Sequence, residues 1–151
     1  MAVPPEPSID VPEGAFPNLT SNNSATTSPA TWDYNCIAWA FGRNDLRLWP
    51  GGPDGYRWPW DVSASETLES IKHLFVSVGY TECDDGSWQP GLEKIAIYVD
   101  AEGPQHAARQ LATGRWTSKL GSLEDIEHTL DAIQGGDYGY PQVFLKRAAG
   151  R

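Results

Sequence analysis

A cysteine at the start of a short apolar helix is the feature that most restricts how this chain can fold. It lies in the segment WDYNCIAWAF, residues 32–41. Asp33 or Asn35 can cap the helix by accepting hydrogen bonds from its unpaired first N–H groups, and Gly42 can end it. The apolar residues in between predict that this helix is buried in the core.

The thiol of Cys36 would lie in the first turn of that helix. The positive end of the helix dipole favours a thiolate over a thiol, so this position predicts a reactive nucleophile. The alternative is a cysteine that only packs in the core, because free cysteines are among the most buried residues.

Length, charge and cysteine count set the outer limits. The chain has 151 residues, two cysteines and a formal net charge of -9. This length suits one domain with a substantial core. The acidic balance argues against nucleic acid as a partner, since nucleic-acid recognition needs clustered Lys and Arg. Two cysteines cannot by themselves form a disulfide framework or a four-ligand zinc site, and we expect no metal and no cofactor.

No stretch of the sequence has the pattern of a Sec signal peptide, and none approaches the length of a membrane span. We therefore expect a soluble protein without a membrane partner, either cytoplasmic or exported by a route other than Sec. Residues 1–30 hold six of the twelve prolines. They predict an extended or disordered N-terminal arm, with residues 31–151 forming the single domain.

Residues 49–60 predict a long loop, because their glycines and prolines exclude a helix or a central strand. Four aromatic residues in this loop need a surface to lie against, either the core or a ligand cleft beside Cys36. Trp58 and Trp60 are the substrate-binding candidates of this loop.

A second helix is predicted after this loop. Residues 63–66 match a capping box, apolar residues then recur at three- and four-residue steps, and Gly79 ends the pattern. His73 falls on the solvent side of that helix, so we assign no chemistry to it.

The remainder of the chain predicts strands. Residues 94–99, 106–111 and 115–120 form a three-stranded meander, residues 122–130 a short helix, and residues 142–146 a last strand. Helices followed by antiparallel strands constitute an α+β layout.

His106 is the candidate base for a thiol nucleophile. It stands at the start of its strand after a Gly-Pro turn, which would expose its ring at a sheet edge facing Cys36. If residues 112–114 form a three-residue loop with Gly114 in the left-handed conformation, Ser118 lies on the histidine's face and can accept the imidazole N–H. A two-residue loop would place Lys119 there instead, and Asp100 is the reserve candidate.

The order of these motifs resembles a known superfamily. Tyr34-Asn35-Cys36 opening a helix, followed by His106 opening a strand, is similar to the papain-like NlpC/P60 and CHAP cysteine peptidases and amidases. Residues 106–110 and 116–121 also look like small bacterial domains of uncharacterised function with the same Asn-Cys start. The resemblance implies a papain-like fold with N-terminal helices packed on an antiparallel sheet. It further implies Cys36 as nucleophile and His106 as base, with the Cys36 backbone N–H and Tyr34 or Asn35 as oxyanion donors.

The sequence departs from these peptidases after the cysteine, where they usually carry Asp-Cys-Ser-Gly and this chain has Asn35-Cys36-Ile37-Ala38. This departure leaves cell-wall specificity open.

Three functions are compatible with these residues. The first is a cysteine hydrolase or acyl-transfer enzyme that acts on an amide through a thioester, with a peptide, peptidoglycan or protein side chain as substrate. The second is a non-catalytic module that binds a protein partner through the aromatic loop. The third is a metal site made from Cys36, His106 and Asp100.

Overall fold

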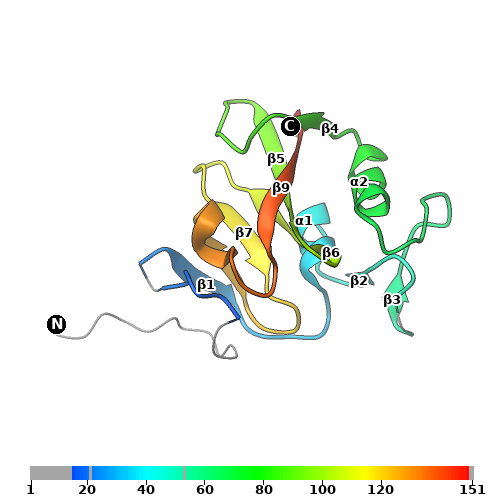
Figure 1. Ribbon diagram of the computed structural model, residues 1–151, viewed down its shortest axis with the longest axis horizontal. Helices are drawn as coiled ribbons and strands as arrows, with labels where there is room; N and C mark the ends of the chain where they lie inside the picture. The colour runs from blue at the N-terminus through cyan, green and yellow to red at the C-terminus, as the bar shows by residue number, and fades with distance from the viewer. Residues whose placement is uncertain (1–14, 21, 53, 150–151) are drawn as a thin grey trace.

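The computed structural model describes residues 15–149, except residues 21 and 53. Within these residues the fold is mixed α and β and is dominated by one antiparallel sheet, in line with the expected α+β layout (Figure 1). The strand order is β1 (Ser24–Ser28), β8 (Asp125–His128), β7 (Trp116–Lys119), β6 (Gly103–Gln110), β5 (Leu92–Asp100), β9 (Tyr140–Ala148) and β4 (Thr81–Cys83). A second, parallel pair joins β2 (Arg47–Leu48) to β3 (Tyr56–Arg57).

The two α-helices form where the sequence predicts them. Helix α1 (Cys36–Phe41) begins after Asn35, whose side chain accepts the Ala38 N–H, and ends at Gly42 with φ of 95°. Helix α2 (Leu68–Val76) begins after Thr67, which accepts the Ser70 N–H. The expected capping box at residues 63–66 is therefore wrong as the helix start. His73 is exposed, as predicted from its position in the helix.

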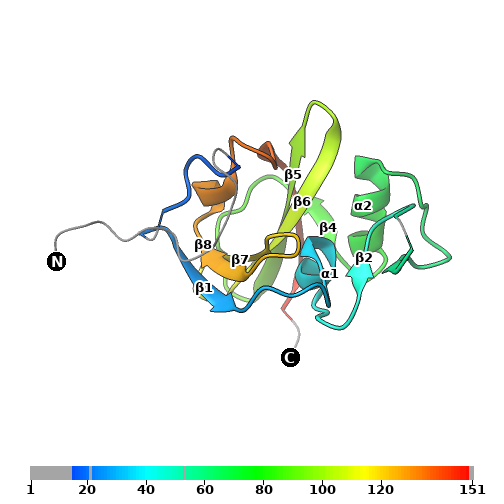
Figure 2. The same cartoon turned by 90° about the horizontal axis from the view of Figure 1, so that it is seen from below.

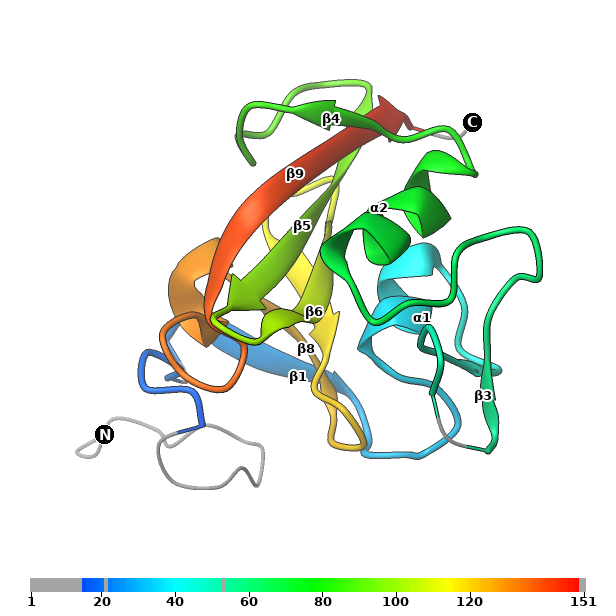
Figure 3. The ribbon, with the colours of Figure 1, turned by 45° about the vertical axis from the view of Figure 1, so that its right-hand side comes forward.

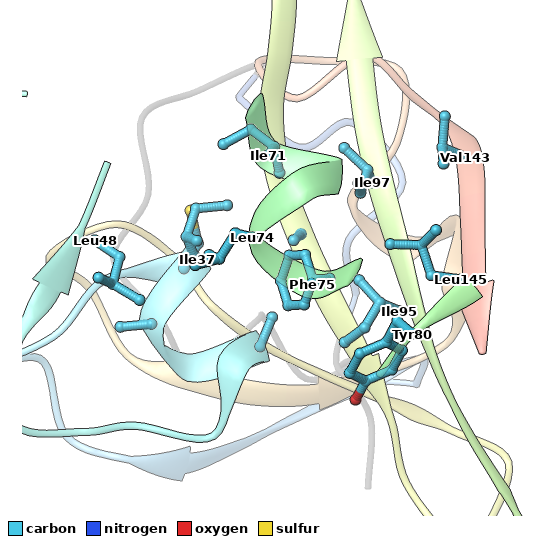
Figure 4. Packing of buried hydrophobic residues seen from close by; sticks show 14 of the residues in the cluster. Ile37, Leu48, Ile71, Leu74, Phe75, Tyr80, Ile95, Ile97, Val143 and Leu145 are labelled. Atoms are coloured by element: carbon cyan, nitrogen blue, oxygen red, sulfur yellow. The ribbon is translucent and has the colours of Figure 1, made fainter. Parts of the chain in front are cut away.

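Both helices pack on one face of the sheet (Figure 3). We call the cluster between them the helix-side core. Figure 4 shows its centre, where α2 lies between α1 and the strands β5 and β9. The buried side chains that form this centre are Ile37, Ile71, Leu74, Phe75, Ile95, Ile97 and Leu145.

The opposite face of the same sheet is also buried. We call its cluster the far-side core, and it contains Leu19, Ala96, Tyr98, Ala108, Trp116, Leu120, Ile126, Ala132 and Ile133. Alternate residues of a strand point to opposite faces. The apolar run of β5 therefore serves both cores, with Ile95 and Ile97 on the helix side and Tyr98 on the far side.

The expected N-terminal arm is in part a piece of the sheet. Strand β1 pairs with β8, with Ser24 opposite His128 and Thr26 opposite Ile126 (Figure 2). Ala15 and Leu19, which precede it, are buried. Residues 1–14 of the expected arm lie outside the described residues, but the boundary at residue 30 falls too late.

The helix expected at residues 122–130 is wrong. This segment forms β8 and is followed by a 3-10 helix, η1 (Leu130–Ile133). Strand β8 pairs with β7 on one side and β1 on the other, and Ile126 enters the far-side core. Pairing on both sides outweighs the helix-start pattern of four residues.

In the part of the chain that the structure describes, no helix has both the length and the apolar character that a membrane crossing requires.

Candidate functional site

Cys36 lines a cavity of about 350 Å³. Four of its ten lining residues are aromatic, and Arg47 and Glu66 are its charged members. The lining residues are Trp32, Tyr34, Asn35, Cys36, Arg47, Trp49, Tyr56, Glu66, Gly121 and Ser122. They come from the start of α1, the loop around β2 and β3, the segment before α2 and the turn after β7, so we call this space the Cys36 cavity.

Asn35 anchors the start of α1 to the wall of the cavity. Its side-chain oxygen accepts the N–H groups of Ala38 at 3.2 Å and Leu48 at 2.9 Å, and its amide donates to the Leu48 carbonyl at 2.8 Å. Both the oxygen and the nitrogen of this amide are thus bonded to the backbone. These bonds hold Asn35 in place to position Cys36, and its expected role in substrate or oxyanion binding stays a prediction.

The hydroxyl of Tyr34 is also engaged. It donates to a carboxylate oxygen of Asp125, which is buried and also accepts the Thr27 hydroxyl at 2.6 Å. Burial and the contact with Asp125 raise the pKa of Tyr34 to about 12. Tyr34 presents its ring to the cavity, but its hydroxyl is not a free oxyanion donor.

The Cys36 thiol experiences two opposing effects. Only 7% of the residue is exposed, and this burial raises the thiol pKa. The backbone N–H groups of Ala107, Ile37 and Cys36 lower the pKa of the thiol, as does the charge of Lys119. Burial prevails, and the pKa of Cys36 is about 11. The expectation of a thiolate favoured by the helix start is therefore wrong for the resting protein, because desolvation outweighs the short helix.

The expected position of His106 at a sheet edge is wrong, because the residue is completely buried in the middle of β6. Its ring stacks on Tyr138, with centroids 4.1 Å apart, and contacts Tyr98 edge-on. These aromatic residues belong to the far-side core. The next residue, Ala107, points to the helix-side core and Cys36. The imidazole and the thiol thus lie in the cores on opposite faces of the sheet.

The expected contact between His106 and Cys36 is not formed. Among the described residues, Nδ1 of His106 has no hydrogen-bond partner. The pairing between β5 and β6 shifts at this point, from Tyr98 opposite His106 to Val99 opposite Pro104. Such bulges redirect side chains and are frequent next to active sites.

The register of the hairpin between β6 and β7 is the predicted one. Leu111 donates to the Arg115 carbonyl at 2.7 Å, and Gly114 has φ of 93°. Ser118 therefore shares a face with His106, and its Oγ lies 2.8 Å from Nε2 of His106. The reserve candidate Asp100 instead accepts from Glu102 N–H and Gln105 Nε2 within its own turn.

His128 is a functional candidate that the sequence did not indicate. His128 is completely buried, and its Nε2 lies 2.7 Å from Oγ of Ser118. The helix predicted at residues 122–130 hid this histidine. The alternation of Asp125, Ile126, Glu127 and His128 between polar and apolar character on a strand could have revealed its inward position.

The two tryptophans expected to bind substrate do not line the Cys36 cavity. Trp58 donates its Nε1–H to the Ser63 carbonyl at 2.8 Å and lines a different hollow, whereas Trp60 is 94% exposed. The same loop instead contributes Trp49 and Tyr56. Loop composition predicts aromatic contact with the cavity, but it cannot tell which rings turn inward.

The structure does not assemble the alternative metal site. No group of three His, Cys, Asp or Glu side chains within residues 15–149, leaving aside residues 21 and 53, is placed to hold a metal ion. Cys36, His106 and Asp100 are thus not gathered into one ligand set.

Fold and site together define a sheet-dominated mixed α and β domain with a buried cysteine in an aromatic cavity. The chain belongs to the family described as "Domain of unknown function (DUF7689)", whose sequence profile matches residues 25–146. That range contains all of the residues of the site discussed above. Comparison with curated proteins and with solved structures returned no match.

Proposed function

We propose that this protein is a cysteine-dependent hydrolase or acyl transferase that acts on an amide, with Cys36 as the nucleophile. The observation that carries the proposal is the environment of the sulfur. The backbone N–H groups of Ala107, Ile37 and Cys36 lower the pKa of the sulfur, which lies at the edge of a cavity. N–H groups near a sulfur favour the thiolate, which is the nucleophilic form.

The reaction would proceed through a thioester. The sulfur of Cys36 attacks the acyl carbon while its proton passes to a base, and the C–N bond then breaks as the amine takes that proton. Water, or a second nucleophile in a transfer reaction, then attacks the thioester and releases the acyl group together with the free thiol.

His106 is the base in this proposal. Its Nδ1, which has no partner among the described residues, can accept a proton, and His106 directly precedes Ala107, whose N–H lowers the pKa of the Cys36 thiol. The free protein has no hydrogen bond between ring and thiol and holds them in the cores on opposite faces of the sheet, so the proposal requires β6 to rearrange on substrate binding before Nδ1 can reach the sulfur. Catalytic hydrogen bonds are often long in free enzymes and tighten in the substrate complex.

The cavity walls favour an apolar or aromatic group next to the reacting amide. Trp49 is held by a hydrogen bond to Glu66, and Arg47 lies 4.8 Å from the centre of the Tyr56 ring. Helix α1 packs on β6, and we include a papain-like relationship in the proposal.

Reaction with p-nitrophenyl acetate tests this function. We expect a burst of p-nitrophenol and one acetyl group on the peptide that contains Cys36. Cys36→Ala should abolish both signals, and Cys83→Ala is the matched control that should retain them. Acetylation that is absent, or that follows Cys83, would contradict the proposal.

The second candidate is a binding module that uses the same cavity. The raised pKa of Cys36 and the missing contact with His106 favour it. In that case an aromatic amide would bind, as seen in the quenching of tryptophan fluorescence, and Cys36→Ala would bind it equally well without any acylation in the parent protein.

A further inference from the structure

Two of the three histidines of the protein belong to one buried hydrogen-bond network. The network runs from His106 through Ser118 and His128 to the backbone carbonyl of Thr129. All three side chains have no exposed surface. Buried polar networks are costly unless each member is satisfied, yet this one ends in the unpartnered Nδ1 of His106.

The Thr129 carbonyl at one end of the network determines which group donates in each hydrogen bond. A carbonyl oxygen can only accept, so Nδ1 of His128, 2.6 Å from the Thr129 oxygen, carries a proton. In a neutral imidazole the other nitrogen is then an acceptor, and Nε2 of His128 must receive the Ser118 hydroxyl. The hydroxyl proton is thereby used, so Oγ of Ser118 accepts from Nε2–H of His106.

This assignment of donors requires that both imidazoles are neutral. Burial lowers the pKa of His128 to about 4, and burial, with the repulsion that a protonated His128 would exert, holds the pKa of His106 well below 6.5. Near neutral pH neither ring carries a second proton. Nδ1 of His106 is then the atom that holds the free lone pair.

We propose that His128 is a positioning residue that acts through Ser118 to keep His106 in the Nε2–H tautomer, with Nδ1 as the proton-accepting atom. Tyr138 holds the plane of the imidazole, since its ring lies parallel to the imidazole at an interplanar angle of 8°. The catalytic meaning of this tautomer rests on the proposed function, but the tautomer itself does not.

Histidine tautomers can be read directly by long-range proton–nitrogen NMR of the nitrogen-15-labelled full chain. We expect the Nε2–H pattern for His106 and the Nδ1–H pattern for His128. The exposed His73 assigns the signals, because His73→Gln removes one of the three histidines without touching the network.

Two substitutions at His128 test its role. His128→Phe removes the acceptor, so the Ser118 hydroxyl turns to donate to Nε2 of His106, which then adopts the Nδ1–H tautomer. His128→Gln places a carbonyl near the former Nε2 and should preserve the original tautomer. The acetylation rate of Cys36 should fall roughly a hundredfold in His128→Phe and much less in His128→Gln.

Retention of the Nε2–H tautomer in His128→Phe would overturn the inference, as would an Nδ1–H pattern in the parent protein. If His128→Phe does not fold, Ser118→Ala serves instead and should give a mixture of both tautomers, whereas an unchanged spectrum would refute the role of the network. The expected tautomers without any acetylation would refute the proposed function alone.

Discussion

The resting state of Cys36 is set by competition within its immediate surroundings. Three backbone N–H groups favour the thiolate, and loss of water around a residue that is 7% exposed opposes it more strongly. The sulfur is therefore protonated in the free protein. Deprotonation has to be coupled to attack on a substrate, which is why the location of a proton acceptor at Nδ1 of His106 matters for the proposed chemistry.

Alkylation by iodoacetamide measures this state. Near neutral pH we expect Cys83, which is half-buried, to be modified before Cys36. This reverses the order that a helix-start thiolate would give. The labelling rate of Cys36 should rise about tenfold per pH unit and level off near pH 11, the pKa of its thiol. Peptide mass spectrometry identifies the labelled cysteine, with Cys83→Ala as control. Fast labelling of Cys36 at neutral pH would show that burial does not raise its thiol pKa more than the backbone N–H groups lower it.

The buried histidines make stability depend on pH. The pKa of His128 is about 4 in the folded protein and near 6.5 when unfolded, so the unfolded state binds more protons between these values. The free energy of unfolding therefore falls as pH drops from 6.5 toward 4. Since one pKa unit is worth about 1.4 kcal/mol, we expect His128 to account for roughly 3 kcal/mol of that loss.

Urea unfolding at a series of pH values checks this slope. Carboxylates also titrate in this range, so the comparison is between the parent protein and His128→Gln, which should have the flatter profile. His73→Gln changes an exposed histidine and should leave the profile as it is. Parallel profiles for the parent and His128→Gln would mean that His128 is not buried in the neutral form.

At the scale of elements, β1 shows how a polar segment becomes part of a fold. Its residues are mostly exposed, but it covers the free edge of β8, and Thr27 bonds to the buried carboxylate of Asp125. The preceding Leu19 enters the far-side core. This segment is attached by strand pairing, by the Thr27 side chain and by Leu19, not by an apolar pattern of its own.

Leu19→Ala should destabilise the domain by about 2–4 kcal/mol, because it removes a buried side chain and leaves a cavity. The urea midpoint of unfolding gives the change. Ala25→Ser, at an exposed position of β1, is the matched control and should shift the midpoint little. If both substitutions shift the urea midpoint equally and only slightly, residues 15–30 form a loosely attached arm.

At the scale of the whole molecule, the Cys36 cavity exists because distant segments are tied together. Asn35 links the start of α1 to β2, and the turn after β7 closes the same space with Gly121 and Ser122. The cavity is thus sensitive to residues that carry no chemistry themselves.

Asn35→Ala tests this link. It leaves the buried N–H and carbonyl of Leu48 without partners, which should cost about 2–4 kcal/mol. It should also speed the alkylation of Cys36 relative to Cys83, because the wall formed by β2 loosens. Asn44→Ala, at an exposed position, should change neither quantity. Loss of stability without faster alkylation would separate the role of Asn35 in folding from a role in shaping the cavity.

Features governed by neighbours in the chain could be predicted from the sequence. Helix α1 with its cap at Asn35 and its end at Gly42, and the placement of Ser118 on the face of His106, depend on contacts within a few residues. A capping amide, a left-handed glycine and the alternation of a strand act locally, so the printed residues were sufficient for them.

Features that depend on distant partners were decided by the tertiary structure. The thiol of Cys36 is protonated because the packed core removes its water. His106 points away from Cys36 because Ala107 occupies the face of β6 that packs on α1, and β8 forms because strands lie on both of its sides. The link from Ser118 to His128 arises from the same pairing. Desolvation and strand pairing sum over residues far apart in the chain, and no local pattern of residues specifies that sum.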